Sequence, residues 1–271
     1  MYSGENNSLN RSTTFSQEIQ AISDLRLSRR KKMKKYPKVS VVLSTVRPDD
    51  LTSILSQIKL QTLKNFELAI GLHGIQLNAR HKLLISELNK RGVKVRVEKF
   101  TKTATLGSIL TDLADKTSGD YVAKMDDDDY YGPEHLRDLV DAIVDKGADV
   151  VGRAMNYVYL EPLDLTVRRF GVQGTQAVEI WSDWVCGGTI LVSRSTGESA
   201  GWFGSGTTAV DRYLLGRVTE NGGRIWRTFG AGYIYKRSFT FHTYTTNYSK
   251  YLKNANQQVV GLWQDKIFGT Q

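Results

Sequence analysis

The segment SGDYVAKMDDDDYYGP, residues 118–133, places four consecutive aspartates, Asp126 to Asp129, directly after a short apolar run. Residues 121–125 have the composition of a buried strand, so the acids begin at its carboxyl end. Adjacent carboxylates repel one another, and poor solvation at the end of a buried strand adds to the cost. The segment therefore predicts a site at which a bound cation relieves that repulsion.

Upstream of this segment, strand-like and helix-like stretches alternate. Residues 39–43 form a β-branched apolar run typical of a strand covered on both faces, and residues 51–58 follow with helical spacing. The same alternation predicts strands at 66–72, 93–97 and 121–125 and helices at 77–90 and 106–116. It indicates an α/β fold with a Rossmann-like, mostly parallel sheet flanked by helices. Such sheets bind ligands at the carboxyl ends of their strands.

Downstream of the aspartates the pattern becomes less regular. A helix is predicted from about residue 136 to Gly147, and another from about 208 to 221. Between them, residues 149–195 are rich in Val, Tyr, Trp, Thr and Gly, which is typical of short strands and long loops. We therefore expect one α/β domain over residues 38–271 with a more irregular carboxyl-terminal half.

Residues 1–37 form a polar tail that becomes strongly basic and ends at Pro37. The net charge of the chain is +9, and the tail with Lys38 carries much of it, in Arg26, Arg29, Arg30, Lys31, Lys32, Lys34, Lys35 and Lys38. Such a run favours a solvated arm, flexible or helical and dispensable for chemistry, over contact with an anionic membrane surface. A specific nucleic-acid partner is not expected, because a charge run alone names none.

The composition argues against a membrane-spanning, a secreted or a disulfide-rich protein. With 271 residues and 40% apolar residues, the chain can bury a large core. No apolar run reaches the roughly 20 residues that cross a bilayer, and the start lacks the apolar segment of a secretory signal. The single cysteine, Cys186, excludes a disulfide framework and is interpreted as a small buried residue. A cytoplasmic protein, peripheral to the membrane at most, is expected.

The aspartate cluster suits a hard cation. In an extended chain Asp126 and Asp128 share one face while Asp127 and Asp129 share the other, so one pair could hold Mn²⁺ or Mg²⁺ and leave positions for phosphate oxygens. An EF-hand is excluded, because the fifth position from Asp126 is a tyrosine and the twelfth an arginine. A solvated acidic turn is the plain structural alternative.

At this point the sequence resembles family 2 glycosyltransferases of the GT-A fold, over about residues 38–242. The resemblance rests on VSVVLSTVRP (39–48), QIKLQT (57–62) before FEL (66–68), SGDYVAKMDDDD (118–129) and Pro133 in this order. It implies a nucleotide-sugar-binding half at 38–132 and an acceptor and catalytic half at 133–271. The processive synthases carry a Gln-x-x-Arg-Trp motif and membrane helices, and this chain has neither, so it is similar to the non-processive members.

The resemblance also implies roles for single residues. It assigns the DxD motif to Asp126, Asp127 and Asp128, with Asp128 as the direct metal ligand and Asp126 nearer the ribose and the metal. Thr45 and Arg47 then lie in the loop beside the nucleotide, and His242 falls where many members carry a late histidine that completes the metal shell. Taken alone, His242 lies among aromatics, where a His is more often a hydrogen-bonded structural residue. His73 follows a strand end and has an equal claim to the pocket by position.

The family's catalytic base falls on Asp211, in TTAVDRYLL (207–215) after the Gly-Gly pair at 187–188. The acid that usually precedes it is replaced by Val210, and Asp183 or Glu179 would be next in line as base. The family's base-contacting segment here reads LHGI (72–75), so the nucleotide base is left open. Trp181 and Trp184 could stack on a sugar or lie in the core.

The function expected from the resemblance is that of a metal-dependent, hexosyl-type glycosyltransferase. It would move a sugar from a nucleotide-diphosphate donor, a UDP-sugar first, to an acceptor hydroxyl with inversion. Two alternatives stay open. One is a two-metal nucleotidyltransferase or nuclease, which needs further acids at metal distance and a basic groove. The other is a non-catalytic sugar- or nucleotide-binding relic of the fold.

Overall fold

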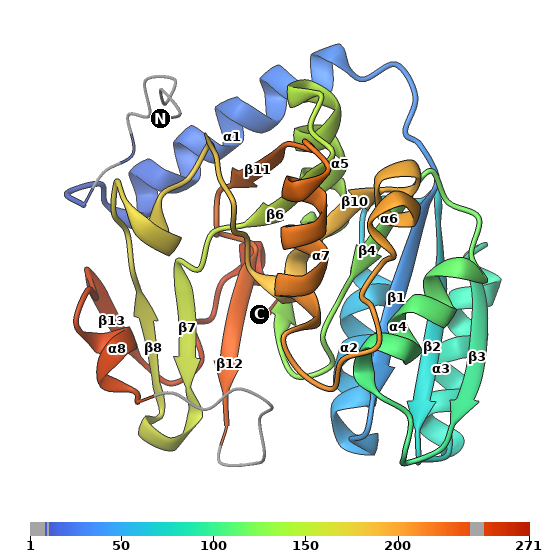
Figure 1. Ribbon diagram of the computed structural model, residues 1–271. Helices are drawn as coiled ribbons and strands as arrows, with labels where there is room; N and C mark the ends of the chain where they lie inside the picture. Colours follow the sequence, from blue (N-terminus) through green and yellow to red (C-terminus); the bar gives the residue numbers. More distant parts are fainter. Residues whose placement is uncertain (1–8, 10, 239–246) are drawn as a thin grey trace.

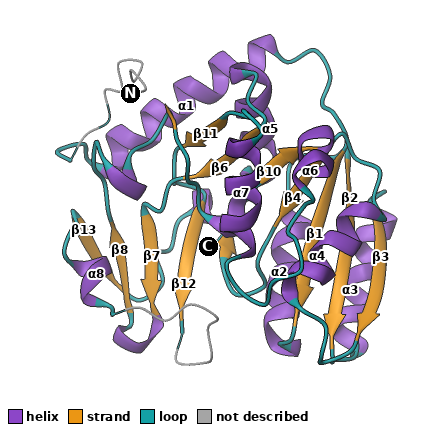
Figure 2. Cartoon of the chain, viewed as in Figure 1, coloured by secondary structure: helices purple, strands orange, loops and turns teal. Residues whose placement is uncertain are grey.

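The computed structural model describes residue 9 and residues 11–238 and 247–271, and it contains two β-sheets (Figure 1). The larger sheet has eight strands in the order β3-β2-β1-β4-β10-β6-β11-β9, and helices cover both of its faces (Figure 2). The smaller sheet has the order β13-β8-β7-β12-β5. It stands to the left of the parallel strands in Figure 1.

The first half of the chain builds the parallel part of the larger sheet. Side chains of β1 alternate between two cores: Val41 and Leu43 pack with α2, α3 and α5, whereas Val42 packs with α4 and α7. All of the strands and helices expected here are present, with ends within three residues of the predicted ones. They are β1 (Val39–Thr45), α2 (Pro48–Leu60), β2 (Phe66–His73), α3 (Ala79–Lys90), β3 (Lys94–Phe100), α4 (Leu106–Asp115) and β4 (Tyr121–Lys124).

The second half extends this sheet beyond β4. Strand β10 pairs antiparallel with both β4 and β6, and β11 is parallel to β6. Helix α5 ends at Lys146 and is capped by Gly147, which has a left-handed φ of 56°. Glycine adopts this conformation without strain. The elements are α5 (His135–Lys146), β6 (Val150–Arg153), β9 (Ile180–Trp181), β10 (Leu191–Ser193), α6 (Arg194–Ala200), α7 (Val210–Glu220) and β11 (Ile225–Thr228).

The smaller sheet lies beside the aspartate segment, because its strand β5 directly follows Asp129. Strand β12 joins β5 on one side and β7 on the other. The elements are β5 (Tyr130–Tyr131), β7 (Tyr157–Leu160), β8 (Leu165–Arg168), β12 (Tyr233–Arg237), α8 (Ser249–Leu252) and β13 (Gln257–Val260), with 3-10 turns η1 (Glu161–Leu163), η2 (Gly174–Gln176), η3 (Gly187–Thr189) and η4 (Lys266–Phe268). The strands are short and the connections long, as the composition predicts.

The solvated arm expected for the tail is wrong for residues 15–32. They form helix α1 (Phe15–Lys32), which starts at a capping box between Thr14 and Gln17 and lies across α5 (Figure 1). Ile22 is 1% exposed and packs in a cluster with Trp263 and Phe268. The tail is thus helical and part of the folded body over this range.

Most of the basic side chains of α1 are ion-paired within the protein. Arg26, Arg30 and Lys32 pair with Asp138, Asp141 and Asp145 of α5, and Arg29 pairs with Asp145 and Glu179. Lys31, Lys34 and Lys35 are exposed. Among the described helices, none combines the length and apolar content needed to cross a bilayer.

Candidate active site

The aspartate segment turns as soon as it leaves the sheet. Strand β4 ends at Lys124, and Asp127 and Asp128 lie in a turn instead of the extended chain assumed from the sequence. Exposure still alternates: the side chains of Asp126 and Asp128 are 36% and 18% exposed, whereas that of Asp127 is 5% exposed. Two carboxylates of the segment therefore reach solvent while their neighbours are buried.

Asp127 is held by the loop after β1. The hydroxyl of Thr45 donates to Oδ2 of Asp127 at 2.5 Å, and the guanidinium of Arg47 binds Oδ1. Burial raises the pKa of Asp127 to about 6, although the bond from Arg47 opposes it. Arg47 also reaches Asp128 Oδ2 at 2.9 Å and Asp50 at 2.9 Å. The structure thus brings the predicted pair Thr45 and Arg47 onto the aspartate segment.

Asp129 anchors the segment to the smaller sheet. The hydroxyl of Tyr233 donates to its Oδ2 at 2.6 Å, and the backbone N–H of Lys236 donates to its Oδ1 at 2.8 Å. Burial, together with the neighbouring carboxylates, raises the pKa of Asp129 well above its usual range. Both partners come from β12, far along the chain, and nothing in the local sequence marks them.

Tyr131 links the segment to the Gly-Gly turn. Its hydroxyl accepts from the backbone N–H of Asp126 at 2.8 Å and donates to the carbonyl of Gly188 at 2.9 Å. Tyr131 is fully buried, and its own N–H donates to Gln57 of α2 at 2.7 Å. The only sequence signal for this role is the Tyr-Tyr pair that follows the acids.

Lys124 bridges Asp126 to the predicted base. Its Nζ lies 2.6 Å from Asp126 Oδ1, 3.0 Å from Asp211 Oδ1 and 3.4 Å from the carbonyl oxygen of Gly187. Burial opposes the charge of this ammonium, but the two carboxylates outweigh it and raise the pKa of Lys124. Sequence reasoning missed Lys124, because a lysine within a strand pattern normally reads as an exposed side chain.

The Gly-Gly turn allows the acids to approach. A Cβ added at Gly187 would lie 1.9 Å from Asp211 Oδ2, and one at Gly188 would lie 2.9 Å from Asp126 Oδ2. Since any side chain here would collide with a carboxylate, both positions need glycine. Asp211 itself lies in the first turn of α7, after Ala209 in a left-handed conformation (φ 56°).

The other candidates lie elsewhere. His73 ends β2, two strands from β4 in the sheet, and its Nε2 is 3.2 Å from the carbonyl of Lys102. His242 lies outside the described residues. Glu179, an alternative base, binds Arg29, Thr228 Oγ1 and the N–H of Phe229 and so has a structural role. Burial raises the pKa of the Cys186 thiol, as expected for an inert core residue.

No described contact links Trp181, Trp184 or Asp183 to the aspartate segment. Trp181 packs edge-on against Trp226, with Arg224 over its ring, and Trp184 is partly buried against the main core. Asp183 is exposed. Within the described residues, no group of three or more His, Cys, Asp or Glu side chains is arranged to hold a metal on its own.

A family model matches part of the chain. Residues 40–172, just under half of the chain, match the family model of Glycosyl transferase family 2, which confirms the resemblance on these residues. No curated protein sequence matches this chain.

Solved structures share the fold at low identity. S. aureus TarS in complex with UDP-GlcNAc has a TM-score of 0.57 at 15% identity, over 80% of this chain and 64% of that one. Full S. aureus TarS has a TM-score of 0.56 at 16% identity, over 74% and 37%. The mannosyltransferase PcManGT from Pyrobaculum calidifontis, in complex with GDP-Man and Mn²⁺, has a TM-score of 0.57 at 15% identity, over 84% and 68%. The fold is GT-A, and this chain spans less than two thirds of the TarS chains.

Proposed function

We propose that this chain, whose residues 40–172 belong to glycosyl transferase family 2, moves a sugar from a nucleotide-diphosphate donor to an acceptor hydroxyl. One observation carries the proposal: Lys124 joins the solvent-accessible carboxylate of Asp126 to that of Asp211, which comes from a distant helix, and the accessible Asp128 lies two residues after Asp126. The solved relatives of the same fold that hold UDP-GlcNAc, or GDP-Man with Mn²⁺, support a donor of this class.

The chemistry of the donor set fits a divalent cation. Asp126 and Asp128 offer accessible oxygens, which Mn²⁺ and Mg²⁺ prefer as ligands. Partial burial, against the opposing charge of Lys124, raises the pKa of Asp126, and the neighbouring Asp211 and Asp128 contribute to the rise. A cation held by Asp128, helped by Asp126, would relieve that crowding. His242 is proposed as a further ligand from the family resemblance alone.

The transfer would proceed by single displacement. The acceptor oxygen bonds to the anomeric carbon, and the bond from that carbon to the diphosphate oxygen breaks with its electron pair staying on the nucleotide diphosphate. Asp211 takes the acceptor proton, while Thr45 and Arg47 line the nucleotide side, with Asp127 held between them. A bound divalent cation would neutralise the charge that develops on the leaving diphosphate.

The division of labour follows the two halves of the chain. Residues 38–132 are proposed to hold the nucleotide-sugar and residues 133–271 the acceptor. His73, at the carboxyl end of β2, is assigned to the nucleotide side. A UDP-sugar is the first donor to test, and the hexosyl type is inherited from the family.

Peripheral contact with an anionic membrane surface would rest on few charges. Among the described residues of the tail, Arg11, Lys31, Lys34 and Lys35 are exposed and form no ion pair, whereas Arg26, Arg29, Arg30 and Lys32 are ion-paired. Each free charge contributes roughly 1 kcal/mol near an anionic surface. Any such contact should therefore be weak, and salt should abolish it in a vesicle sedimentation assay.

The decisive assay measures transfer and donor hydrolysis across UDP-, GDP-, dTDP- and CDP-sugars with Mn²⁺, Mg²⁺ or EDTA. Asp211→Asn should lower the transfer rate by about 10²–10⁴-fold and leave donor affinity near wild type, because the donor is held elsewhere. Asp128→Asn should lower the rate and also weaken the metal response. Asp24→Asn, on the exposed face of α1, is the matched control and should change neither.

Three outcomes would redirect the proposal. Full activity under complete chelation would remove the metal from the mechanism. A near wild-type rate for Asp211→Asn would make that residue structural. Cleavage of a nucleic acid or transfer of a nucleotidyl group would favour the two-metal alternative, and donor binding without any turnover would favour the relic.

A further inference from the structure

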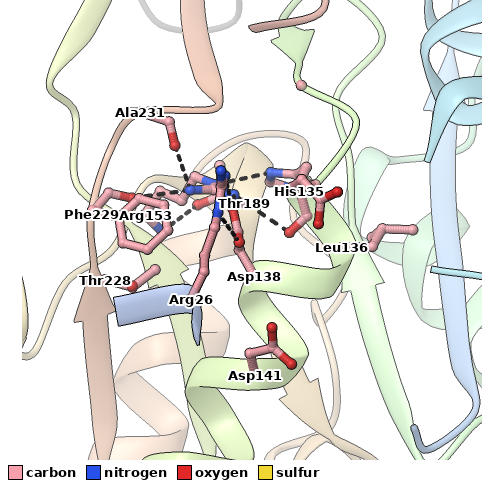
Figure 3. Close-up of polar contacts among 12 residues, drawn as sticks. Arg26, His135, Leu136, Asp138, Asp141, Arg153, Thr189, Thr228, Phe229 and Ala231 are labelled. Atoms are coloured by element: carbon pink, nitrogen blue, oxygen red, sulfur yellow. Dashed lines mark hydrogen bonds and ion pairs between the residues drawn. The ribbon is translucent and has the colours of Figure 1, made fainter. Parts of the chain in front are cut away.

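The side chain of Arg153, at the end of β6, is hydrogen-bonded at each of its three nitrogens (Figure 3). It is 0% exposed, and its Nε donates to His135 Nδ1 at 3.0 Å. One terminal nitrogen donates to the carbonyls of Phe229 at 3.2 Å and Ala231 at 2.7 Å. The other donates to Asp138 Oδ2 at 2.9 Å and to the carbonyl of His135 at 3.5 Å. Every N–H of the guanidinium therefore has an acceptor.

The backbone of Arg153 holds the Gly-Gly turn. Its N–H donates to Thr189 Oγ1 at 2.8 Å, and its carbonyl accepts from the N–H of Cys186 at 3.0 Å. These bonds fix the turn on both sides of the glycines. Gly187 and Gly188 are the residues against which Asp211 and Asp126 pack, so Arg153 sets one wall of the site without touching an acid of the cluster.

The side chain of Arg153 holds two further supports. His135 packs edge-on against Tyr131, with ring centroids 4.7 Å apart, and Ala231 lies two residues before Tyr233 at the start of β12. Tyr131 binds the backbone of Asp126, and Tyr233 binds the carboxylate of Asp129. Two supports of the aspartates thus meet the guanidinium of Arg153, and the third, the Gly-Gly turn, is held by the backbone of the same residue.

Helix α1 completes this network. The guanidinium of Arg26 binds both oxygens of Asp138, at 2.8 Å and 2.7 Å, and Arg153 binds one of them from the other side. Asp138 is 0% exposed, and the charges of Arg26 and Arg153 hold its pKa below its usual range against the effect of burial. Figure 3 shows Asp138 below the Arg153 cluster, with Arg26 reaching it from α1.

We propose that Arg153 is a positioning residue for the aspartate cluster and that Arg26 of α1 fixes its partner Asp138. Docking of α1 and the geometry of the site are then coupled. The reason is geometric: with Arg26 in place both oxygens of Asp138 accept hydrogen bonds, whereas without it Oδ1 keeps only the longer ion pair with Arg30, at 3.8 Å, and the group can turn away from Arg153. The metal readout below rests on the proposed function, but the exchange readout does not.

The first test compares three variants of α1 that remove or keep one positive charge. Arg26→Gln removes the positive charge and the paired hydrogen bonds to Asp138, whereas Arg26→Lys keeps the charge but cannot bind both oxygens in the same way. Lys31→Gln removes a charge at an exposed position and is the matched control. Binding of Mn²⁺ alone is measured by electron paramagnetic resonance. The dissociation constant should rise about three- to tenfold in Arg26→Gln, recover in part in Arg26→Lys and stay unchanged in the control.

The second test needs neither metal nor donor. Hydrogen exchange is followed at the amides of Asp126 and Lys236, which bond to Tyr131 and Asp129, and at Ile70 of β2 as an internal control. In Arg26→Gln and in Arg153→Lys, exchange at Asp126 and Lys236 should speed up more than at Ile70. A merely structural role would speed up all of these sites together.

The outcomes separate the two claims. If exchange at Asp126 and Lys236 in folded Arg26→Gln and Arg153→Lys matches Ile70, the positioning role is overturned, whatever the metal does. If exchange changes as expected but wild type binds no Mn²⁺, the metal in the proposed function is wrong and the positioning role stands. Acceleration of exchange in the Lys31→Gln control would also overturn the role, since any loss of charge on α1 would then suffice.

Discussion

The buried faces of the parallel half of the larger sheet and of helix α1 differ in the share of charged side chains that they carry. Strand β1 and helix α2 bury apolar side chains such as Val41, Leu43 and Ile54, each 0% exposed. The buried face of α1 carries Glu18 at 0% and Arg29 at 3%, held by ion pairs, in addition to the apolar Ile22 at 1%. Apolar burial stabilises by roughly 25 cal/mol per Å², whereas a buried ion pair roughly balances its desolvation cost.

This difference decides how each region responds to change. An apolar contact weakens gradually as atoms are removed, while a buried charge that loses its partner is left uncompensated. The helix α1 interface should therefore be more sensitive to single charge changes, to acid and to truncation than the parallel sheet. The predictions below test that contrast in order of expected effect.

Removal of residues 1–34 should abolish the folded state. It removes Glu18, the ion-pair partner of the buried Arg168, takes Arg26 from Asp138, which keeps Arg153, and uncovers the apolar cluster that holds Ile22. Each buried charge left alone costs roughly 3–5 kcal/mol, against a total stability of about 5–15 kcal/mol. Loss of a cooperative thermal transition in circular dichroism would bear this out. A truncated chain that melts at the wild-type temperature would show that α1 is only loosely attached.

Glu18→Gln should lower the free energy of unfolding by about 3 kcal/mol. Glu18 Oε2 accepts from Arg168 at 2.8 Å and from the Tyr157 hydroxyl at 2.7 Å, all within the buried interface. Urea unfolding measures the loss. Ile54→Ala, in the apolar region, should lower the free energy of unfolding by roughly 2–5 kcal/mol, because it leaves a cavity. The magnitude of the loss therefore does not by itself distinguish the two regions.

A double mutant distinguishes a loss of stability caused by an uncompensated charge from one caused by a cavity. Glu18→Gln combined with Arg168→Met should recover much of the loss, because no uncompensated charge remains. The cavity left by Ile54→Ala has no such partner to remove. Failure of Arg168→Met to recover stability would mean that Glu18 acts through Tyr157 alone.

Acid should weaken the network around α1 through His135. Burial and the charge of Arg153 hold the pKa of His135 well below its usual range, so the folded protein keeps this ring neutral. The unfolded chain takes up a proton below about pH 6.5, so stability is complete above that pH and falls as the pH drops further. The slope is up to about 1.4 kcal/mol per pH unit for this one group. Unfolding curves of wild type minus those of His135→Gln isolate its contribution, and equal slopes would contradict the assignment.

Lys32→Gln should have the smallest effect. Its Nζ lies 2.6 Å from Asp145, but the side chain is 64% exposed, so water screens the pair. Such surface pairs contribute about 0.2–1 kcal/mol, and added salt removes most of that. A loss as large as that of Glu18→Gln, measured by the same urea titration, would break the distinction between buried and surface charges on α1.

The sequence also located much of the candidate site. The alternation of strands and helices put Asp126 to Asp129 at the carboxyl end of β4, and the Gly-Gly pair and Asp211 followed from the family pattern. The contacts of Lys124, Tyr131 and Tyr233 were not predicted. Their side chains are polar or aromatic in strands, a pattern that local rules interpret as surface or general core.

The α1 interface escaped the sequence for a related reason. Periodicity methods count apolar residues, and on α1 the buried positions include Glu18 and Arg29, with Arg26 half-buried beside them, all of which such methods assign to solvent. Their partners lie more than a hundred positions away, on α5, β8 and the loop before β9. No local pattern can pair groups so far apart.

By itself, then, the sequence determined the α/β order, the apolar core of β1 to β4 and the position of the acids, because these depend on neighbours within a few residues. Tertiary structure alone decided that Lys124 joins Asp126 to Asp211, that Arg153 gathers three supports and that α1 docks through ion pairs as well as apolar contacts. A charged side chain is stable in a core only beside its partner. Which partner that is depends on how the chain folds back on itself.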